Sequence, residues 1–314
     1  MSTQTKKIRN KINGWIILDK GLGITSTDAV NRVRRLFNAE KAGHAGTLDP
    51  LATGILPIAL GEATKTIPYI QEAAKRYRFT VKWGEARNTD DAEGVVTNTS
   101  DNRPTDEAIL AILPNFTGEI DQVPPKFSAI KINGVRAYDL ARAGEEVEMV
   151  SRKVWIDSLE LVENSPENAI FDVECGKGTY MRSLARDMAE ALGTYGHIAV
   201  LRRLSVGSFT EERAILLDDL EKIVQSSQPY ACLLPIETAL ADIPALALTA
   251  QEASRLANGQ VVSFISRQDI GRFAIAGIDI QGPAQTALAT SGDRAVAVIE
   301  VDGPQIRPVR VLNL

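Results

Sequence analysis

The hydrophobic positions along the chain form short apolar runs separated by amphipathic stretches, a pattern typical of a protein that mixes strands and helices. Residues 15–18 (WIIL) and 54–60 (GILPIAL) are apolar runs that suit buried strands. Residues 76–84 alternate instead, with Tyr77 on the apolar side, and this alternation predicts a half-buried strand. Further strands are predicted from residue 94, over residues 171–175 and around Phe209.

A period of 3.6 residues recurs in several segments and predicts amphipathic helices. In the first, Thr25 or Ser26 can cap a helix whose apolar residues, from Val30 to Phe37, lie on one face. The other predicted helices cover residues 104–113 with Thr105 as the cap, 181–192 with Gly193 as the stop, 216–224, and 249–258 before Gly259.

The composition changes after about Leu240. Lys222 is the last lysine, and short β-like runs follow at residues 273–275, 295–299 and 309–311. We therefore predict two domains, residues 1–240 and a mostly β domain of residues 241–314.

Residues 124–152 break the periodic pattern. They start with two prolines and interleave basic residues with Phe127 and Tyr138; the basic residues are Lys126, Lys131, Arg136 and Arg142. Such a mixture suits contact with an RNA backbone and its bases, but it equally suits a surface insertion with a small core of its own.

Composition and cysteine content describe an ordinary globular protein. The 314 residues are 44% hydrophobic and 24% charged, and no run of about 18 apolar residues predicts a membrane span. The basic N-terminus lacks the apolar region of a signal peptide, so we expect a cytoplasmic location. Two cysteines, Cys175 and Cys232, suggest neither a disulfide framework nor a cysteine zinc site.

The charge is distributed unevenly. A net charge of −5 argues against an indiscriminate polyanion binder, yet residues 1–36 carry eight Lys or Arg against Asp19 and Asp28. This basic segment is compatible with an RNA-binding face and, equally, with a solvated tail and helix.

The segment of residues 44–66 (HAGTLDPLATGILPIALGEATKT) carries the strongest candidate chemistry. Asp49 stands before a proline, which is common in turns that have no catalytic role. However, Gly43 and Gly46 permit close backbone approach, His44 can donate a hydrogen bond, and Thr47 can hold the loop in one shape. From these residues alone, Asp49 is either a turn former or a rigidly presented carboxylate.

Five blocks, in order, resemble the tRNA pseudouridine synthase B (TruB) family. GHAGTLDPLATGILPIALGEATK is similar to its active-site motif, and WIILDKGLGITST and KRYRFTVKWG resemble its N-terminal and stacking-tyrosine motifs. VPPKFSAIKINGVRAYDLARAGEEV resembles its thumb insertion, and CGKGTYMRSLARDM with LRRLSVGSF resembles part of its pocket. Residues after Leu240 resemble its PUA-like C-terminal domain less closely. One departure is Gly21, where the family usually has a proline.

The resemblance implies an α+β pseudouridine synthase fold. This fold has a mixed, largely antiparallel central sheet flanked by helices, with a thumb insertion at residues 124–152 and a small, mostly β, PUA-like domain. The implied activity is isomerisation of the uridine at position 55 of the tRNA T loop to pseudouridine. The implied enzyme needs no cofactor and no metal and acts on the tRNA T arm, and we expect a monomer.

The resemblance also assigns residues. Asp49 matches the nucleophile, Arg182 the arginine that pairs with it, and Tyr77 the tyrosine that stacks on the target base. The other matches, for substrate contacts or the floor of the site, are His44, Tyr180, Leu201 and Lys20. Asp90 matches a position near the pocket, with a structural role equally compatible, and Arg202 and Arg203 are predicted to meet phosphates.

Two other functions fit the same blocks. One is the guide-RNA-dependent pseudouridine synthase of archaea and eukaryotes. The bacterial-type insertion and the net negative charge of this chain disfavour it. The other is an RNA-folding protein that keeps the fold without turnover, which the set of Asp49, Tyr77 and Arg182 disfavours as a sole role.

Overall fold

The computed structural model describes residues 9–128, 130–132, 134–145 and 148–314. Lys6 and Lys7 of the predicted basic segment lie outside these residues, as do the side chains of Lys131 and Arg136 in the insertion. No helix within the described ranges combines the length and apolarity that crossing a membrane requires.

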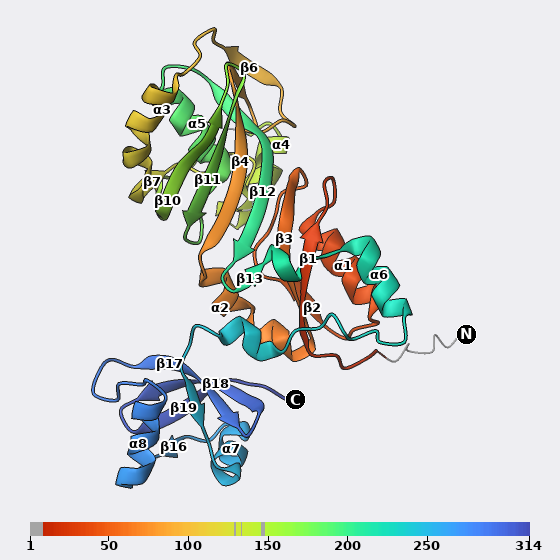
Figure 1. Cartoon of the computed structure of the whole chain (residues 1–314), viewed down its shortest axis with the longest axis vertical. Coiled ribbons are helices and arrows are strands. Elements are labelled where there is room, and N and C mark those ends of the chain that lie inside the picture. The colour runs from red at the N-terminus through yellow and green to blue at the C-terminus, as the bar shows by residue number, and fades with distance from the viewer. Residues whose placement is uncertain (1–8, 129, 133, 146–147) are drawn as a thin grey trace.

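Ten strands form one large sheet, in the order β14-β1-β3-β12-β4-β11-β10-β7, with β2 beside β3 and β13 beside β12 (Figure 1). The strands are β1 (Gly14–Lys20), β2 (Ala42–His44), β3 (Ala52–Leu60), β4 (Lys75–Trp83), β7 (Gly118–Gln122), β10 (Arg152–Asn164), β11 (Asn168–Cys175), β12 (Gly196–Val206), β13 (Phe209–Thr210) and β14 (Ile215–Leu216). Among these described strands, the β1–β14 and β3–β12 pairs are parallel and the others antiparallel. The predicted mixed, largely antiparallel sheet is confirmed.

Helices cover the two halves of this sheet. The helices are α1 (Ser26–Leu36), α2 (Ile67–Glu72), α3 (Asp106–Ile112), α5 (Met181–Ala191) and α6 (Leu217–Gln225), with 3-10 turns at Gly61–Thr66, Leu113–Phe116, Glu211–Arg213 and Ile236–Leu240. Helices α1 and α6 pack together beside β1, whereas α5 packs on β4 and β12 (Figure 1). Thr25 and Thr105 cap α1 and α3 as predicted, because their side chains accept from backbone N–H groups in the first turn.

Strand β12 joins the two halves of the sheet, because it pairs with β3 on one side and with β4 on the other. Its pairing with β3 is unusually close at Gly54, where a Cβ would overlap the carbonyl oxygen of Arg203. Gly54 also has φ of +99°, a conformation that side chains with a Cβ rarely adopt. Glycine at this position therefore lets the first residues of β3, Ala52 to Gly54, lie directly beside β12.

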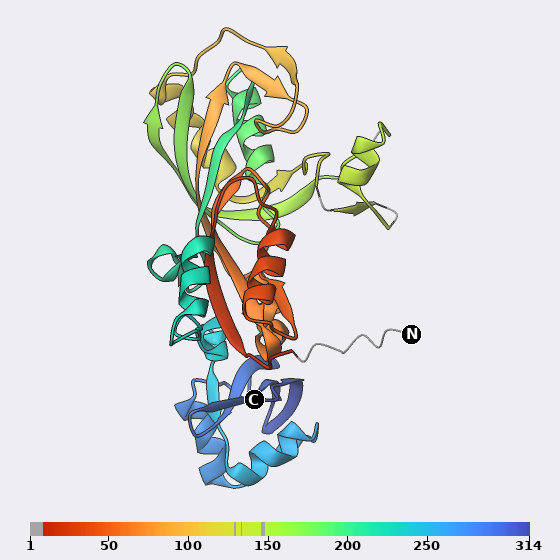
Figure 2. The ribbon, with the colours of Figure 1, turned by 90° about the vertical axis from the view of Figure 1, so that its right-hand side faces the viewer.

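The insertion at residues 124–152 leaves the body of the molecule (Figure 2). Its described elements are β8 (Lys131–Ile132), β9 (Val135–Arg136) and α4 (Ala137–Arg142), and β8 pairs with β9 as a small hairpin of its own. A second two-stranded ribbon, β5 (Glu85–Arg87) and β6 (Val96–Thr99), follows β4 and brackets a polar loop.

Residues 245–311 form a second, five-stranded sheet with its own core. Its elements are β15 (Ala245–Ala247), α7 (Ala250–Ala257), β16 (Val262–Ser263), α8 (Arg267–Ile275), β17 (Gln285–Ser291), β18 (Arg294–Asp302) and β19 (Gln305–Val311). Helix α7 begins with the capping box of Thr249 and Glu252. The two sheets share a cluster in which Trp15 and Leu240 pack with Val298 and Leu312.

One prediction in this region is wrong. Residues 273–275 were expected to be β-like, but they end helix α8. Phe273 is buried and its ring meets Phe264 edge-on at 4.8 Å, whereas Ile275 is exposed. Three apolar residues cannot distinguish a strand from one turn of a helix, and the Ser266 side chain that accepts from the Asp269 N–H is the signal of the helix start.

Candidate active site

The loop between β2 and β3 carries Asp49 and is held from behind by the start of α1. The Ser26 hydroxyl accepts from the Leu48 N–H (2.8 Å) and donates to the Leu48 carbonyl (2.9 Å). The Gly23 N–H donates to the carbonyl of Pro50 (2.8 Å). The residues on both sides of Asp49 are thus fixed, while the Asp49 side chain itself remains 42% exposed.

Lys20 lies under this loop and is fully buried. Its ammonium donates to the carbonyl oxygens of Gly21 (3.0 Å), Ile24 (3.0 Å) and Pro50 (3.3 Å). Burial lowers the pKa of Lys20, and the charge of Asp49 acts in the opposite direction. These contacts place the Lys20 ammonium beneath the Asp49 loop and close the turn that starts at Gly21.

Arg182 reaches Asp49 from the first turn of α5. One guanidinium nitrogen lies 3.0 Å from the Asp49 carboxylate, and the other lies 3.6 Å from that of Asp91. The same guanidinium donates to the carbonyl oxygens of Thr89 (3.2 Å) and Phe127 (3.1 Å). With its side chain 8% exposed, Arg182 is a buried cation between two carboxylates rather than a surface arginine.

These side chains line a small cleft. Its walls are formed by Asp49, Leu51, Ala52, Asp91, Arg182, Ile198, Ala199 and Leu201. Tyr77 lies on β4, packs against the main core and is paired with Arg203 of β12, whereas Leu201 of β12 is paired with Phe79. A larger cavity of about 340 Å³ lies beside β13 and contains none of the predicted site residues. Within the described part of the chain, no three His, Cys, Asp or Glu side chains gather as a metal-binding group.

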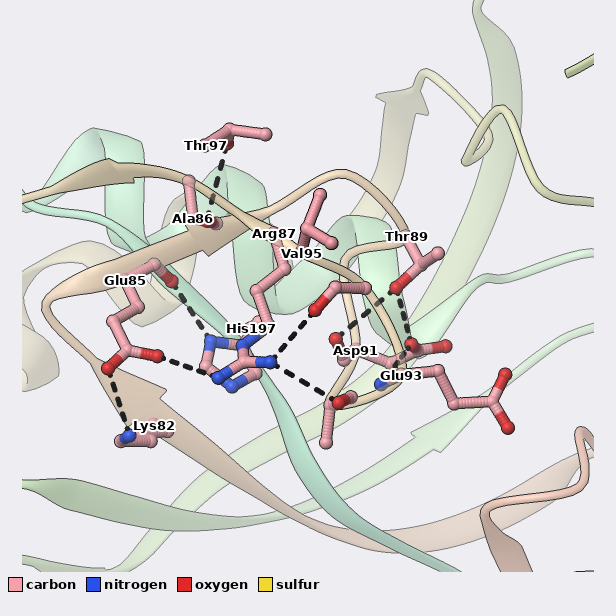
Figure 3. Close-up of polar contacts among 12 residues, drawn as sticks. Lys82, Glu85, Ala86, Arg87, Thr89, Asp91, Glu93, Val95, Thr97 and His197 are labelled. Atoms are coloured by element: carbon pink, nitrogen blue, oxygen red, sulfur yellow. Dashed lines mark hydrogen bonds and ion pairs between the residues drawn. The ribbon is translucent and has the colours of Figure 1, made fainter. Parts of the chain in front are cut away.

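The loop between β5 and β6 contributes Asp91 to this cleft. The polar contacts within the loop are drawn in Figure 3. Arg87 holds the loop closed by donating to the carbonyl oxygens of Ala92 (3.3 Å) and Gly94 (2.8 Å). The Thr89 hydroxyl donates to the Asp91 carboxylate at 2.6 Å and fixes its orientation. Asp91 therefore faces Arg182 as a preorganised acceptor.

Asp90 lies next to the cleft without lining it, whereas its neighbour Asp91 does line it, so the contacts of Asp90 favour the structural role that the sequence left open. The Asp90 carboxylate pairs with Arg186 at 3.0 Å, and the backbone of Asp90 has φ of +59°. Burial raises the pKa of Asp90 to about 6, against the opposing effect of Arg186. Two adjacent aspartates in a turn point in different directions, and the sequence alone does not say which one faces Arg182.

The raised pKa of Asp90 predicts a pH dependence of stability. The folded chain holds a proton on Asp90 between about pH 4 and pH 6 that the unfolded chain has lost, so ionisation of Asp90 destabilises the fold as the pH rises through this window. Relative to Asp90→Asn, the wild type should lose about 2–3 kcal/mol of unfolding free energy from pH 4 to pH 6.5. Urea unfolding at several pH values measures this difference, and parallel curves for the two proteins would contradict it.

Neither His44 nor Tyr180 is among the residues that line the cleft. His44 is in β2, and its buried Nδ1 has no hydrogen-bond partner among the described residues. Burial, followed by the charge of Arg203, lowers the His44 pKa and favours the neutral ring. Tyr180 precedes the first residue of α5 without a capping hydrogen bond from its side chain. Its backbone N–H donates to the Gln122 side chain (2.8 Å), and its carbonyl accepts from it (3.2 Å).

The predicted phosphate contacts of Arg202 and Arg203 are not supported by the structure. Arg202 pairs with Asp19 (2.9 Å) and Glu211 (2.6 Å), and Arg203 is 1% exposed. Arg203 shares the inward face of β12 with Leu201, as alternation along a strand requires. The burial of Arg203 and the orientation of Asp91 are the two features of the site that the sequence analysis missed. The sequence did contain a signal for the burial of Arg203, because a residue two positions after the apolar Leu201 lies on the same face of a strand.

Two family models match adjacent parts of the chain. The model described as "TruB family pseudouridylate synthase (N terminal domain)" matches residues 34–181, and "tRNA pseudouridylate synthase B C-terminal domain" matches residues 182–241. The second match includes β12, so the boundary at residue 182 runs through the large sheet rather than between the two sheets.

Several relatives match almost the whole chain. A tRNA pseudouridine synthase B of Bradyrhizobium diazoefficiens is 54% identical over 99% of this chain and 89% of its own, and that of Caulobacter vibrioides is 52% identical over 98% and 99%. A chain in a crystal structure of a Cbf5–Nop10–Gar1 complex is 25% identical with a TM-score of 0.70, over 92% of this chain and 79% of that one. A chain of an H/ACA RNP bound to a substrate RNA shares the fold at 22% identity and a TM-score of 0.71, over 96% and 85%. The chain thus belongs to the tRNA pseudouridine synthase B family, whose members are pseudouridine-forming isomerases.

Proposed function

We propose that this protein converts the uridine at position 55 of the tRNA T loop to pseudouridine, with Asp49 as the nucleophile. The observation that carries the proposal is the Asp49–Arg182 pair, 3.0 Å apart at the wall of a cleft, in which the arginine is buried and the carboxylate is half exposed. A reactive carboxylate needs both a fixed orientation and access to its target, and this pair provides both.

The reaction is an isomerisation whose atoms balance without a co-reactant. The bond from the ribose C1′ to uracil N1 breaks and one from C1′ to C5 forms, while C5 loses a proton and N1 gains one. Asp49 would attack while the base detaches and rotates, and Arg182 would keep the carboxylate directed into the cleft. Tyr77, on the β4 side of the site, would stack on the base and take part in the proton transfer from C5. His44, Tyr180 and Leu201 would surround the nucleotide.

A T-loop uridine is stacked in a folded arm, so it has to leave its stack to reach Asp49, at a cost of a few kcal/mol. We propose that the insertion at residues 124–152 grips the T arm. It projects from the body and carries exposed Lys126 and Arg142. Residues 241–314 would act as a PUA-like domain that reaches the acceptor stem. The names of the relatives support a tRNA partner, and we propose a cytoplasmic monomer that needs no metal or guide RNA.

Incubation of the purified protein with an unmodified tRNA transcript, without any other RNA, tests the proposal. We expect one pseudouridine per transcript, at position 55, detected by carbodiimide labelling and primer extension. A transcript with cytidine at position 55 is the matched control and should gain none. Absence of product from the first transcript, or product at another position, would contradict the assignment.

A further inference from the structure

Arg203 is a buried cation whose role the proposed chemistry does not yet include. It is 1% exposed, its Nε donates to the Ile55 carbonyl (2.7 Å), and one Nη donates to the Gly46 carbonyl (3.1 Å). Among the residues that the structure describes, it forms no ion pair with a carboxylate. Arg202, the next residue, faces the other way and pairs with Asp19.

A merely structural role does not explain the charge. Removing a guanidinium from water costs several kcal/mol, and an apolar side chain of similar volume often stabilises a core at least as well. Two neutral carbonyl groups offset that cost less well than a carboxylate would. A charge retained at such a cost usually acts on a neighbouring functional group.

The functional group beside Arg203 is the phenol of Tyr77. The two residues are directly paired between β12 and β4, on the face of the sheet that bears the site. Burial raises the pKa of Tyr77, whereas the charge of Arg203 lowers that pKa. Arg203 therefore weakens the hold of the phenol oxygen on its proton.

The contact with Gly46 places the same guanidinium under the other side of the site. Gly46 comes three residues before Asp49, and a Cβ on it would lie 3.3 Å from Arg203, so the loop rests directly on the guanidinium. Its φ of +99° also favours glycine. The guanidinium thus contacts the Asp49 loop, which joins β2 and β3, while Arg203 itself is the cross-strand partner of Tyr77 on β4.

We propose that Arg203 is a positioning residue that ties the Tyr77 phenol to the Gly46 carbonyl, so that the stacking tyrosine and the Asp49 loop keep a fixed separation. This inference deepens the proposed function and rests on it. A loss of alignment of about 1 Å between reacting groups can cost roughly 100-fold in rate. Arg203 would therefore influence the chemical step and leave tRNA affinity nearly unchanged.

Single-turnover rate constants and tRNA dissociation constants for Arg203→Met and Arg203→Lys test the inference. We expect Arg203→Met to lower the rate constant about 100-fold with the dissociation constant within about twofold of the wild type. Arg203→Lys keeps the charge but cannot reach both carbonyl acceptors in one plane, so it should recover part of that loss. Arg78→Met is the matched control: Arg78 is on β4 with its side chain 52% exposed and pairs with Asp172, so its rate should equal that of the wild type.

Combination with Tyr77→Phe separates positioning from general stability. If Arg203 acts through the phenol, adding Arg203→Met to Tyr77→Phe should cost at least threefold less than the single Arg203→Met change. The inference would be overturned if the two changes lowered the rate constant by independent factors that multiply in the double variant. It would also be overturned if Arg203→Met weakened tRNA affinity and left the rate constant unchanged. If Arg203→Met does not fold, Arg203→Lys in both backgrounds decides the question in the same way. An inactive wild type would instead contradict the proposed function itself.

Discussion

Replacement of Asp49 by asparagine is expected to abolish pseudouridine formation while the protein still binds tRNA. Asparagine has nearly the shape of aspartate. Its amide oxygen can therefore still accept a hydrogen bond from Arg182, which in the wild type lies 3.0 Å from the Asp49 carboxylate. It cannot act as the nucleophile, so the single-turnover rate constant should fall by roughly 10⁴-fold or more. The half-exposed side chain of Asp49 contributes little to the packing of the loop, and the fold should survive the change.

Product formation followed over hours measures the rate constant, and a filter-binding titration of the same transcript measures tRNA affinity. Asp172→Asn is a suitable control because the Asp172 carboxylate also pairs with an arginine, Arg78, but lies away from the cleft. That variant should retain the wild-type rate. Turnover in Asp49→Asn within tenfold of the wild type would exclude Asp49 as the nucleophile, even with the family membership unchanged.

Local patterns account for much of the fold. The alternation around Tyr77 corresponds to β4, the apolar run of residues 54–60 to β3, and the cap at Thr25 to the start of α1. These elements are predictable because each shows one consistent pattern over at least seven residues: alternation in β4, a continuous apolar run in β3 and a 3.6-residue period in α1. Sheet order is different. The parallel β3–β12 pair joins strands about 150 residues apart, and nothing in either segment specifies the partner.

The site was predictable to the extent that family resemblance supplied it. The resemblance brought Asp49 and Arg182 together, and the structure shows the contact. It did not reveal that Asp91 rather than Asp90 faces Arg182, because the choice depends on the left-handed turn at Asp90 and on the hydrogen bond from Thr89. Nor did the pair Arg202 and Arg203 show which member is buried, since the pleat of β12 sends the two side chains to opposite faces.

Loss of the Arg182 guanidinium is the second large effect that we expect. Its four acceptors lie in three separate segments: the loop with Asp49, the turn with Thr89 and Asp91, and Phe127 in the insertion. In Arg182→Met, Asp91 becomes a buried carboxylate without its cation, which should cost about 3 kcal/mol of unfolding free energy. The rate constant should fall roughly 10³-fold, because the direction of the Asp49 carboxylate is no longer fixed.

Arg182→Lys distinguishes geometry from charge at this position. A single ammonium can neutralise Asp91 and restore stability, but it cannot bridge Asp49, Thr89 and Phe127 together, so we expect near-normal unfolding with a rate constant still about 100-fold low. Arg186→Met, one turn further along α5, removes the partner of Asp90 and a contact to the Val123 carbonyl. It should destabilise the fold comparably and leave the rate within about threefold of the wild type. If Arg182→Lys restored full activity, charge alone would suffice, and the contacts that link the insertion to Asp49 would have no part in catalysis.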